Sequence, residues 1–315
     1  MNLVKSFAFF LAIFLGCGGG VIKTGGIGLV TVLVIDPQSA WFAAGSQERR
    51  GLQLAEWDEN GALIPFQAKS AKFQSVRAKI ADSRRMVPLA SNGQIHLIQS
   101  LHIVRSFPLD SSFIVTAIGM QEDLVAIGGR DKQSDYPKIA LFQISTGMEL
   151  KSLPSPDYIR GVSIHSLVFR ENLLLVSSLM SVDVWSVKDS KRVGRVTTDV
   201  GFEDIVFEAD DTIIAGQING AILKCRLGEE KCRAFIQTEQ PVSALAIAGE
   251  RLFSGGEGED INVWNLKTGA PIAKLKTGQL GTETLIVSVN TGRLVAGHTW
   301  GRVTVWDSLA LKAIK

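Results

Sequence analysis

The sequence has little cysteine and little histidine, and each shortage excludes a class of protein. Three cysteines in 315 residues cannot form the disulfide framework of a small secreted domain, and a chain of this length buries a sufficient core without one. The four histidines show no metal-binding spacing and no neighbouring cluster of cysteines or carboxylates, so we predict no metal site. They are His96, His102, His165 and His298.

An excess of charge of either sign is also missing. Lys and Arg number 33 against 31 Asp and Glu, the two signs are interspersed, and the net charge is +2. Faces that bind nucleic acid carry clustered cations. We therefore predict no nucleic-acid partner and no basic face for an anionic membrane.

Catalytic and cofactor-binding motifs are missing as well. The sequence contains no G-x-S-x-G nucleophile elbow. The glycine-rich stretch 16–28 includes Lys23-Thr24, but it precedes a strand instead of joining a strand to a helix, so it does not fit a phosphate loop. The acidic stretch 257–260 lacks the alternating ligands of a calcium loop and is interpreted as a solvated turn. We predict that the protein is not an enzyme and binds no cofactor.

The first 17 residues differ from the rest of the chain. Lys5 precedes an apolar run over residues 6–15, which is typical of a signal peptide and short for the roughly 20 residues of a membrane span. A glycine followed by Cys17 resembles the lipobox of bacterial lipoproteins, in which the signal is cleaved before a cysteine that carries a diacylglycerol. We predict a signal peptide over residues 1–17 with Cys17 lipidated, and a glycine-rich tether over residues 18–28. A simple cleaved signal and an uncleaved anchor stay open as alternatives.

From residue 29 onward one pattern recurs seven times: a short apolar strand ending in small residues, a polar loop, and an apolar strand ending near an aromatic residue. The clearest copy is LFSGGEGEDINVWNLKTGAPIAKL, residues 252–275. One aromatic or apolar residue marks the third strand of each copy, and successive marks are 41, 44, 43, 40, 39 and 42 residues apart. A period of about 40 to 45 residues is typical of four-stranded propeller blades. The marks are Trp57, Ile98, Phe142, Trp185, Cys225, Trp264 and Trp306.

The segments around these marks are typical of β-strands. They are short, rich in β-branched residues and bounded by Gly, Asn or Asp, and many are apolar throughout, as expected for strands covered on both faces. We predict an all-β, seven-bladed β-propeller with four antiparallel strands per blade, which fills residues 29–315 and leaves no room for a second domain. The last outermost strand is expected within residues 309–315, where residues 21–23 could add an edge strand. The expected blades span residues 29–69, 70–109, 110–153, 154–196, 197–237, 238–276 and 277–315.

Four of the marks are Trp residues followed by Asp or by another small polar residue. The Trp-Asp dipeptide is complete at Trp57-Asp58 and Trp306-Asp307 and weakened at Trp264-Asn265 and Trp185-Ser186. Over nearly all of its repeat region the chain therefore resembles WD-repeat β-propellers. It departs from them in lacking the Gly-His pair before a first strand, because Gly297-His298 is expected in a loop after a second strand. The resemblance implies a non-enzymatic scaffold that binds a protein partner.

Propellers built from pyrroloquinoline-quinone-type repeats, found in some envelope assembly lipoproteins, are the alternative family. Those repeats place a Trp shortly after a Thr-Gly turn, whereas Trp264 precedes Thr268-Gly269. The sequence therefore favours the WD type.

Two cysteines remain when Cys17 is set aside, Cys225 and Cys232. They flank the expected hairpin between the third and fourth strands of the fifth blade, and cross-strand neighbours lie at a separation that a disulfide can bridge. An oxidising compartment favours that bridge. The alternative is that Cys225 only replaces the core aromatic residue as a small apolar side chain.

Partners of WD-repeat propellers commonly dock where loops between second and third strands meet loops between successive blades, and the resemblance implies the same face here. The longest such loop is GGRDKQSDYPK, residues 128–138, and long loops on a rigid scaffold often carry recognition. Trp300 either anchors a partner or folds over a blade edge. The candidate partner-binding residues are Arg49, Arg50, Arg130, Asp131, Tyr136 and Trp300 in the first set of loops and Tyr158 in the second.

Together these features predict an exported, lipid-anchored propeller that holds a protein partner at the cell envelope, on the periplasmic or outer surface. One alternative is an enzyme or small-ligand binder that uses the central channel, which requires titratable side chains to converge there. Another is an intracellular WD-repeat scaffold with a fortuitous apolar start, which requires reduced cysteines.

Overall fold

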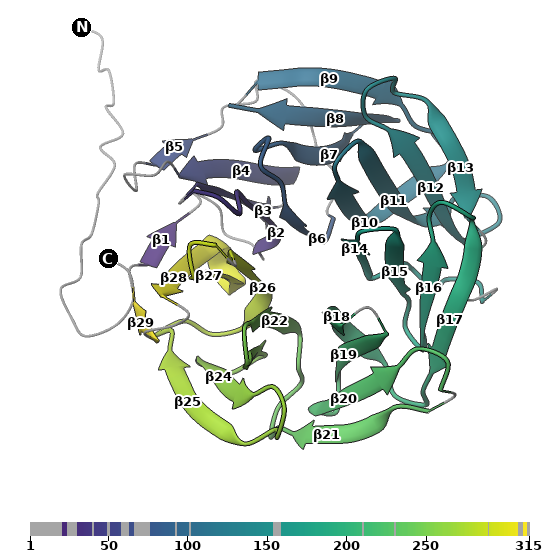
Figure 1. Cartoon of the computed structure of the whole chain (residues 1–315). Helices are drawn as coiled ribbons and strands as arrows, with labels where there is room; N and C mark the ends of the chain where they lie inside the picture. The colour runs from purple at the N-terminus through teal and green to yellow at the C-terminus, as the bar shows by residue number, and fades with distance from the viewer. Residues whose placement is uncertain are drawn as a thin grey trace, which may run out of the picture.

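Seven small β-sheets stand around a central axis in the computed structural model of the chain (Figure 1), following one another in chain order. Apart from one 3-10 turn, Thr299–Gly301, the elements of the described part are β-strands. The same part contains no helix long and apolar enough to cross a membrane. The described residues are 21–23, 30–39, 41–48, 51–57, 63–65, 76–91, 93–100, 102–153, 159–209, 211–229, 231–288, 290–307 and 311–313.

The third to sixth blades have the predicted arrangement of four antiparallel strands, placed from the channel outward in chain order. The third consists of β10 (Phe113–Gln121), β11 (Leu124–Asp131), β12 (Pro137–Gln143) and β13 (Glu149–Leu153). The fourth consists of β14 (Ser166–Arg170), β15 (Leu173–Ser177), β16 (Ser181–Ser186) and β17 (Lys191–Thr197). The fifth consists of β18 (Phe202–Ala209), β19 (Thr212–Gln217), β20 (Ala221–Arg226) and β21 (Arg233–Gln237). The sixth consists of β22 (Ala244–Ala248), β23 (Arg251–Gly255), β24 (Asp260–Asn265) and β25 (Pro271–Lys276).

In the other three blades, one strand of the second blade pairs with the first, and the seventh blade contains strands from both ends of the chain. The first consists of β2 (Val30–Ile35), β3 (Phe42–Glu48), β4 (Gly51–Trp57) and β5 (Leu63–Pro65). The second consists of β6 (Ala78–Ala81), β7 (Val87–Ser91), β8 (Gln94–Gln99) and β9 (His102–Pro108). The seventh consists of β26 (Thr282–Ser288), β27 (Arg293–His298) and β28 (Arg302–Asp307), with β29 (Lys312–Ala313) and β1 (Val21–Lys23) at its outer edge.

The seven marks found in the sequence occupy equivalent positions. Each lies in the third strand of its blade and pairs with the first or second residue of the second strand. The step of 39 to 44 residues is therefore the length of one blade, and the prediction of a seven-bladed propeller is confirmed. The pairs are Phe42–Trp57, Val87–Ile98, Val125–Phe142, Leu174–Trp185, Ile213–Cys225, Leu252–Trp264 and Leu294–Trp306.

The hydrophobic core lies between neighbouring blades. One cluster joins Leu175 and Val182 of the fourth blade to Phe202 and Ile213 of the fifth, and all four are fully buried. Burying a side chain of this size contributes roughly 1.5–3 kcal/mol. Because each inner strand is covered by a blade on both faces, strands such as β16 are buried at every position instead of alternating.

The second blade departs from the predicted four antiparallel strands. Its sheet contains β7, β8 and β9, while the expected innermost strand, β6, pairs in parallel with β2 of the first blade. Just before β6, Arg77 forms a parallel bridge with Ala117 of β10. β6 therefore lies across the inner wall of the ring, between β2 and β10 (Figure 1).

The alternation of side chains along β6 explains this departure. Ala78 and Ile80 are buried in the hydrophobic core, whereas Arg77 and Lys79 stand on the opposite face and line the channel. An ordinary innermost strand is covered on both faces, and there these cations would lose their hydration. By lying flat, β6 buries its apolar face and turns its basic face to the channel.

Two short strands from opposite ends of the chain share the outermost position of the seventh blade. β29 pairs with Trp306 and Asp307 at one end of β28, and β1 pairs with residues 302–304 at the other, both antiparallel. A segment that precedes the first blade thus closes the ring onto the last. Residues 21–23 of the predicted tether are therefore a strand, and its other residues lie outside the described part.

Candidate functional site

Two sets of loops meet on one face of the ring. Because the strands of a blade alternate in direction, the loop between its second and third strands lies on the same side as the loop that leads to the next blade. We call this side the binding face. Four of the predicted site residues, Arg49, Arg50, Tyr158 and Cys17, lie outside the described residues.

Asp131 shapes the loop between β11 and β12. Its carboxylate accepts hydrogen bonds from the Ser112 hydroxyl (2.6 Å) and from the backbone N–H groups of Gln133 and Ser134 (3.0 and 2.8 Å). These bonds, that of Ser112 first, lower the pKa of Asp131 far below its ordinary value. The side chain is thus committed to holding the loop.

Arg130 and Tyr136 join that loop to the connection that leads into the fourth blade. Arg130 Nη1 lies 2.9 Å from Asp135 Oδ1, and the Gly161 N–H donates to the Asp135 carbonyl at 2.9 Å. The Arg160 guanidinium stands 5.6 Å from the centre of the Tyr136 ring. Sequence reasoning missed Arg160, which belongs to the same cluster.

Trp300 is exposed on the 3-10 turn between β27 and β28. Its side chain is 63% exposed, so it does not fold over a blade edge. Its backbone has a φ of +65°, a region that bulky residues rarely adopt and that functional sites often retain. The Thr299 N–H donates to the Gly281 carbonyl at 3.0 Å, which places Trp300 on the loop beside exposed Leu280.

Exposed apolar side chains concentrate on the binding face. Among the described residues, twelve large hydrophobic side chains are strongly exposed, and six of them belong to the loops of this face. Five others lie on outermost strands, and one, Met148, lies on a loop of the opposite face. The six are Ile159, Leu179, Met180, Ile218, Leu280 and Trp300.

Leu179 and Ile218 lie together on this face, and with Met180, the residue after Leu179, they are called the apolar patch. The Phe202 N–H donates to the Leu179 carbonyl, and the Ile218 N–H donates to the Gly201 carbonyl. A Cβ atom on Gly201 would lie 3.1 Å from Leu179 Cδ1 and 3.6 Å from Ile218 Cδ1. The absence of a side chain at Gly201 therefore lets the two apolar side chains cover one spot between the fourth and fifth blades.

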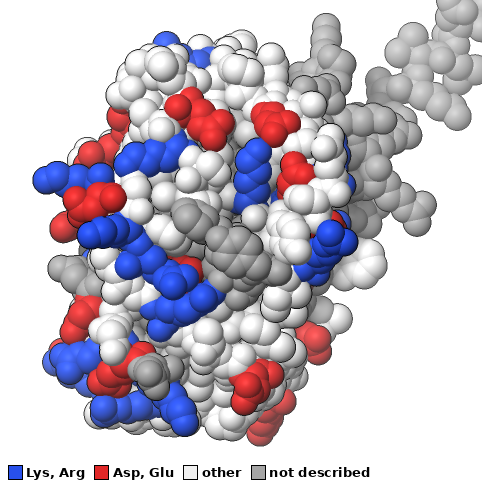
Figure 2. Space-filling model, turned by 90° about the vertical axis from the view of Figure 1, so that its right-hand side faces the viewer, with Lys and Arg blue, Asp and Glu red and all other residues white. Residues whose placement is uncertain are grey.

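Acidic side chains lie on the loops that follow the apolar patch around the ring. These exposed residues are Asp199 and Glu239 before β18 and β22, and Glu257 and Glu259 between β23 and β24. By contrast, both signs of charge are scattered over the outer edge formed by β13 and β17 (Figure 2). This sector of the binding face is thus acidic and apolar together.

The central channel opens on the binding face at a ring of bulged residues. Four innermost strands carry a β-bulge near their start, at Thr31, Thr116, Glu203 and Glu283. A bulge takes a residue out of the strand ladder and redirects its side chain. The channel mouth is the cavity lined by three of these residues, Thr31, Glu203 and Glu283, together with Arg77, His165 and Thr284.

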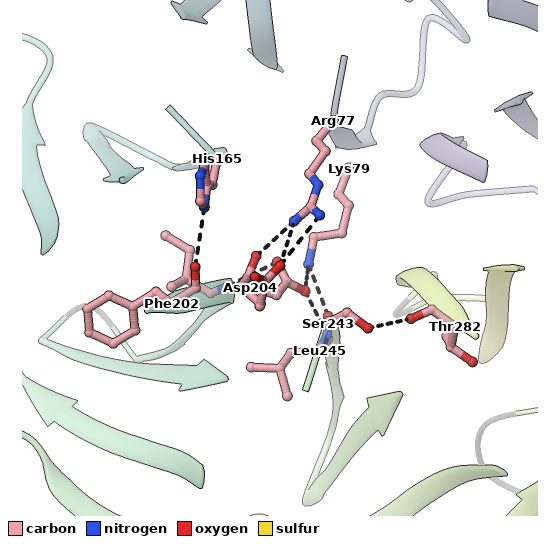
Figure 3. Close-up of polar contacts among 10 residues, drawn as sticks. Arg77, Lys79, His165, Phe202, Asp204, Ser243, Leu245 and Thr282 are labelled. Carbon is pink, nitrogen blue, oxygen red and sulfur yellow. Dashed lines mark hydrogen bonds and ion pairs between the residues drawn. The ribbon is translucent and has the colours of Figure 1, made fainter. Parts of the chain in front are cut away.

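Cations from the second blade reach across the channel to acids of the fifth (Figure 3), and all four of these side chains line the same cavity. Lys79 donates to the Asp204 carboxylate and to the Leu245 carbonyl, and this ion pair is largely buried. Arg77 contacts the Glu203 carboxylate at 3.4 Å and lies closer to solvent. The titratable groups that an enzyme or ligand binder in the channel requires do converge, and four of them form the pairs Arg77–Glu203 and Lys79–Asp204.

Little space remains in the channel mouth. Its volume is about 20 Å³, enough for about one water molecule. Burial lowers the pKa of His165, so its ring is neutral at pH 7. Within the described residues no group of three His, Cys, Asp or Glu side chains could hold a metal ion.

Cys225 and Cys232 are joined by a disulfide. The bridge closes the turn between β20 and β21, and Cys225 is also fully buried in the core between the fourth and fifth blades. Cys225 therefore takes the core position of the aromatic residue and also forms the disulfide bridge.

Comparison with known proteins shows what fold this is. The sequence matches no protein-family model and no curated protein. Among solved structures, the WD40 β-propeller domain of Doa1 aligns with a TM-score of 0.74 at 14% sequence identity, covering 95% of this chain and 100% of that one. This likeness and the seven equivalent marks establish the fold, a seven-bladed β-propeller similar to that WD40 domain.

Proposed function

We propose that this propeller is a non-enzymatic scaffold that holds a protein partner on its binding face. The observation that carries the proposal is the distribution of exposed apolar side chains, six on the loops of that face against one on the opposite loops. Exposed apolar patches rimmed by polar residues mark protein interaction sites. Trp300 and Met180 are of residue types enriched in protein interfaces.

Photo-crosslinking in the source cell tests this proposal with a matched pair of positions. A crosslinking residue replaces Ile218 in the apolar patch or, as control, Ile272 on the outermost strand of the sixth blade. The two isoleucines are 47% and 45% exposed, so the two positions are matched in accessibility. We expect position 218 to capture one protein, and Leu179→Asp to reduce that yield. Capture from position 272 alone, or from neither position, would refute a partner on the binding face.

We further propose that the scaffold is exported and anchored in a membrane by lipid on Cys17. The apolar run over residues 6–15 and the Gly16-Cys17 sequence support this location. The Cys225–Cys232 disulfide supports an oxidising compartment, where such bridges persist. The partner would then be a protein of the cell envelope.

A further inference from the structure

The channel mouth holds acceptor atoms that no donor of the described residues satisfies. The hydroxyls of Thr31 and Thr284 have no hydrogen-bond partner there, although these residues are only 8% and 5% exposed. Thr31 stands at a bulge, the position that directs Glu203 and Glu283 toward the mouth. Buried hydroxyl oxygens without a partner are costly, so a site that contains two of them is suited to a missing donor.

The charge at the mouth is negative. Three carboxyl groups and two cations line this cavity; Arg77 contacts Glu203 and Lys79 pairs with Asp204, which leaves Glu283. Glu283 has no hydrogen bond or ion pair within the described part of the chain. Burial raises the pKa of Glu283, Arg77 lowers it, and Glu203 and Glu257 raise it further. The positive charge of Arg77 therefore does not fully stabilise the ionised carboxylate. A cation that enters from the binding face would stabilise the ionised Glu283 carboxylate.

We infer that the channel mouth binds the ammonium group of a lysine side chain, carried by the protein partner on which the proposed scaffold function depends. An ammonium group is compact and has three donors, which suits a space of about 20 Å³ between carboxylate and hydroxyl oxygens. A guanidinium group is planar and larger than an ammonium group, and the mouth already contains one, that of Arg77, which contacts Glu203.

The surface around the mouth fits the rest of such a side chain. A Cβ atom on Gly281 would lie 3.5 Å from Glu283 Oε1, which places the carboxylate beside the loop that carries Leu280. Trp300 lies on the adjoining loop. A lysine buries its methylene stem on apolar surface while its charged end finds a partner. Leu280 and Trp300 would thus cover the stem while Glu283 receives the ammonium.

A small probe tests the mouth without the partner. Nα-acetyl-lysine methylamide is titrated into the full chain, and the carboxyl resonance of Glu283 is followed by NMR with 13C-labelled glutamate. We expect saturable binding with a Kd on the order of millimolar, as for a single small contact. Glu283→Gln should weaken it by about tenfold, the effect of losing a charge-assisted hydrogen bond. Thr31→Val should weaken it about threefold, because the isosteric side chain removes only one acceptor.

Matched controls separate the possible outcomes. Glu149→Gln changes an exposed acid on the outermost strand β13, away from the binding face, and should leave probe binding unchanged, and the Nε-acetylated probe should not bind. A thermal melt verifies that each variant is folded. Equal binding of the arginine analogue would refute selectivity for lysine, and an unmoved Glu283 resonance would refute the site.

Crosslinking from Ile218 then distinguishes this inference from the scaffold function itself. If lysine recognition holds, Glu283→Gln lowers the capture yield at position 218 and Glu149→Gln does not. Capture that is unaffected by Glu283→Gln would overturn the lysine site and leave the scaffold intact. If nothing is captured from position 218, the scaffold function fails, whatever the probe does.

Discussion

His298 is the last residue of β27, although the sequence had placed it in a loop, and its ring is fully buried. Nε2 lies 2.6 Å from the Thr304 hydroxyl and Nδ1 lies 3.3 Å from the Thr282 hydroxyl. Burial lowers the pKa of His298 from 6.5 to about 4. The neutral ring therefore links three strands of the seventh blade, just below the loop that carries Trp300.

The stability of the folded protein should depend on pH through this residue. Between pH 6.5 and pH 4 the unfolded chain takes up a proton at His298 that the folded chain does not bind, so the free energy of unfolding falls as the pH falls. The loss is about 3 kcal/mol, from about 1.4 kcal/mol per pKa unit. Urea unfolding at pH 7 and pH 4 should show a loss that is about 3 kcal/mol larger in the wild type than in His298→Gln. His102→Gln, at an exposed position, serves as control, and equal pH dependence in all three would refute the argument.

At the scale of the element, the strands show what a sequence can predict and what it cannot. Spacing located all seven third strands, because each mark packs in the same core position. It did not predict that β6 would leave its blade, because pairing with β2 depends on acids more than a hundred residues away. The alternation of Arg77 and Lys79 with Ala78 and Ile80 was the local sign of a strand with one polar face.

The closing strand β1 gives a prediction at the same scale. A variant that begins at Val21 keeps β1, whereas one that begins at Thr24 loses its pairing with β28. The shorter variant should be less stable by about 1–3 kcal/mol, the net value of a few backbone hydrogen bonds. Urea unfolding of the two variants measures the difference. Equal free energies of unfolding would mean that β29 alone closes the seventh blade.

For the whole molecule, the candidate site could be predicted only in part. Loop length and an unusual Trp indicated the binding face through the resemblance to WD-repeat propellers. The channel mouth was missed because Thr31, Glu203 and Glu283 come from three blades and meet only when the ring closes. Their shared sign, a polar residue just after the start of an apolar innermost strand, is visible only once the blades are superimposed.

Ring closure also constrains how a lipid on Cys17 would hold the molecule. Three residues separate Cys17 from Val21, which β1 fixes at the edge of the seventh blade, so four Cα–Cα steps span at most about 14 Å. We expect the mature chain to begin at Cys17, to incorporate labelled fatty acid and to sediment with membranes, because acyl chains bury many methylene groups. Cys17→Ser should abolish the label and retain the signal segment, and intact mass measures both. An unlabelled chain cut elsewhere would indicate a simple signal peptide. An unlabelled chain of full length would indicate an uncleaved anchor, and either result would remove the short link between the seventh blade and the membrane.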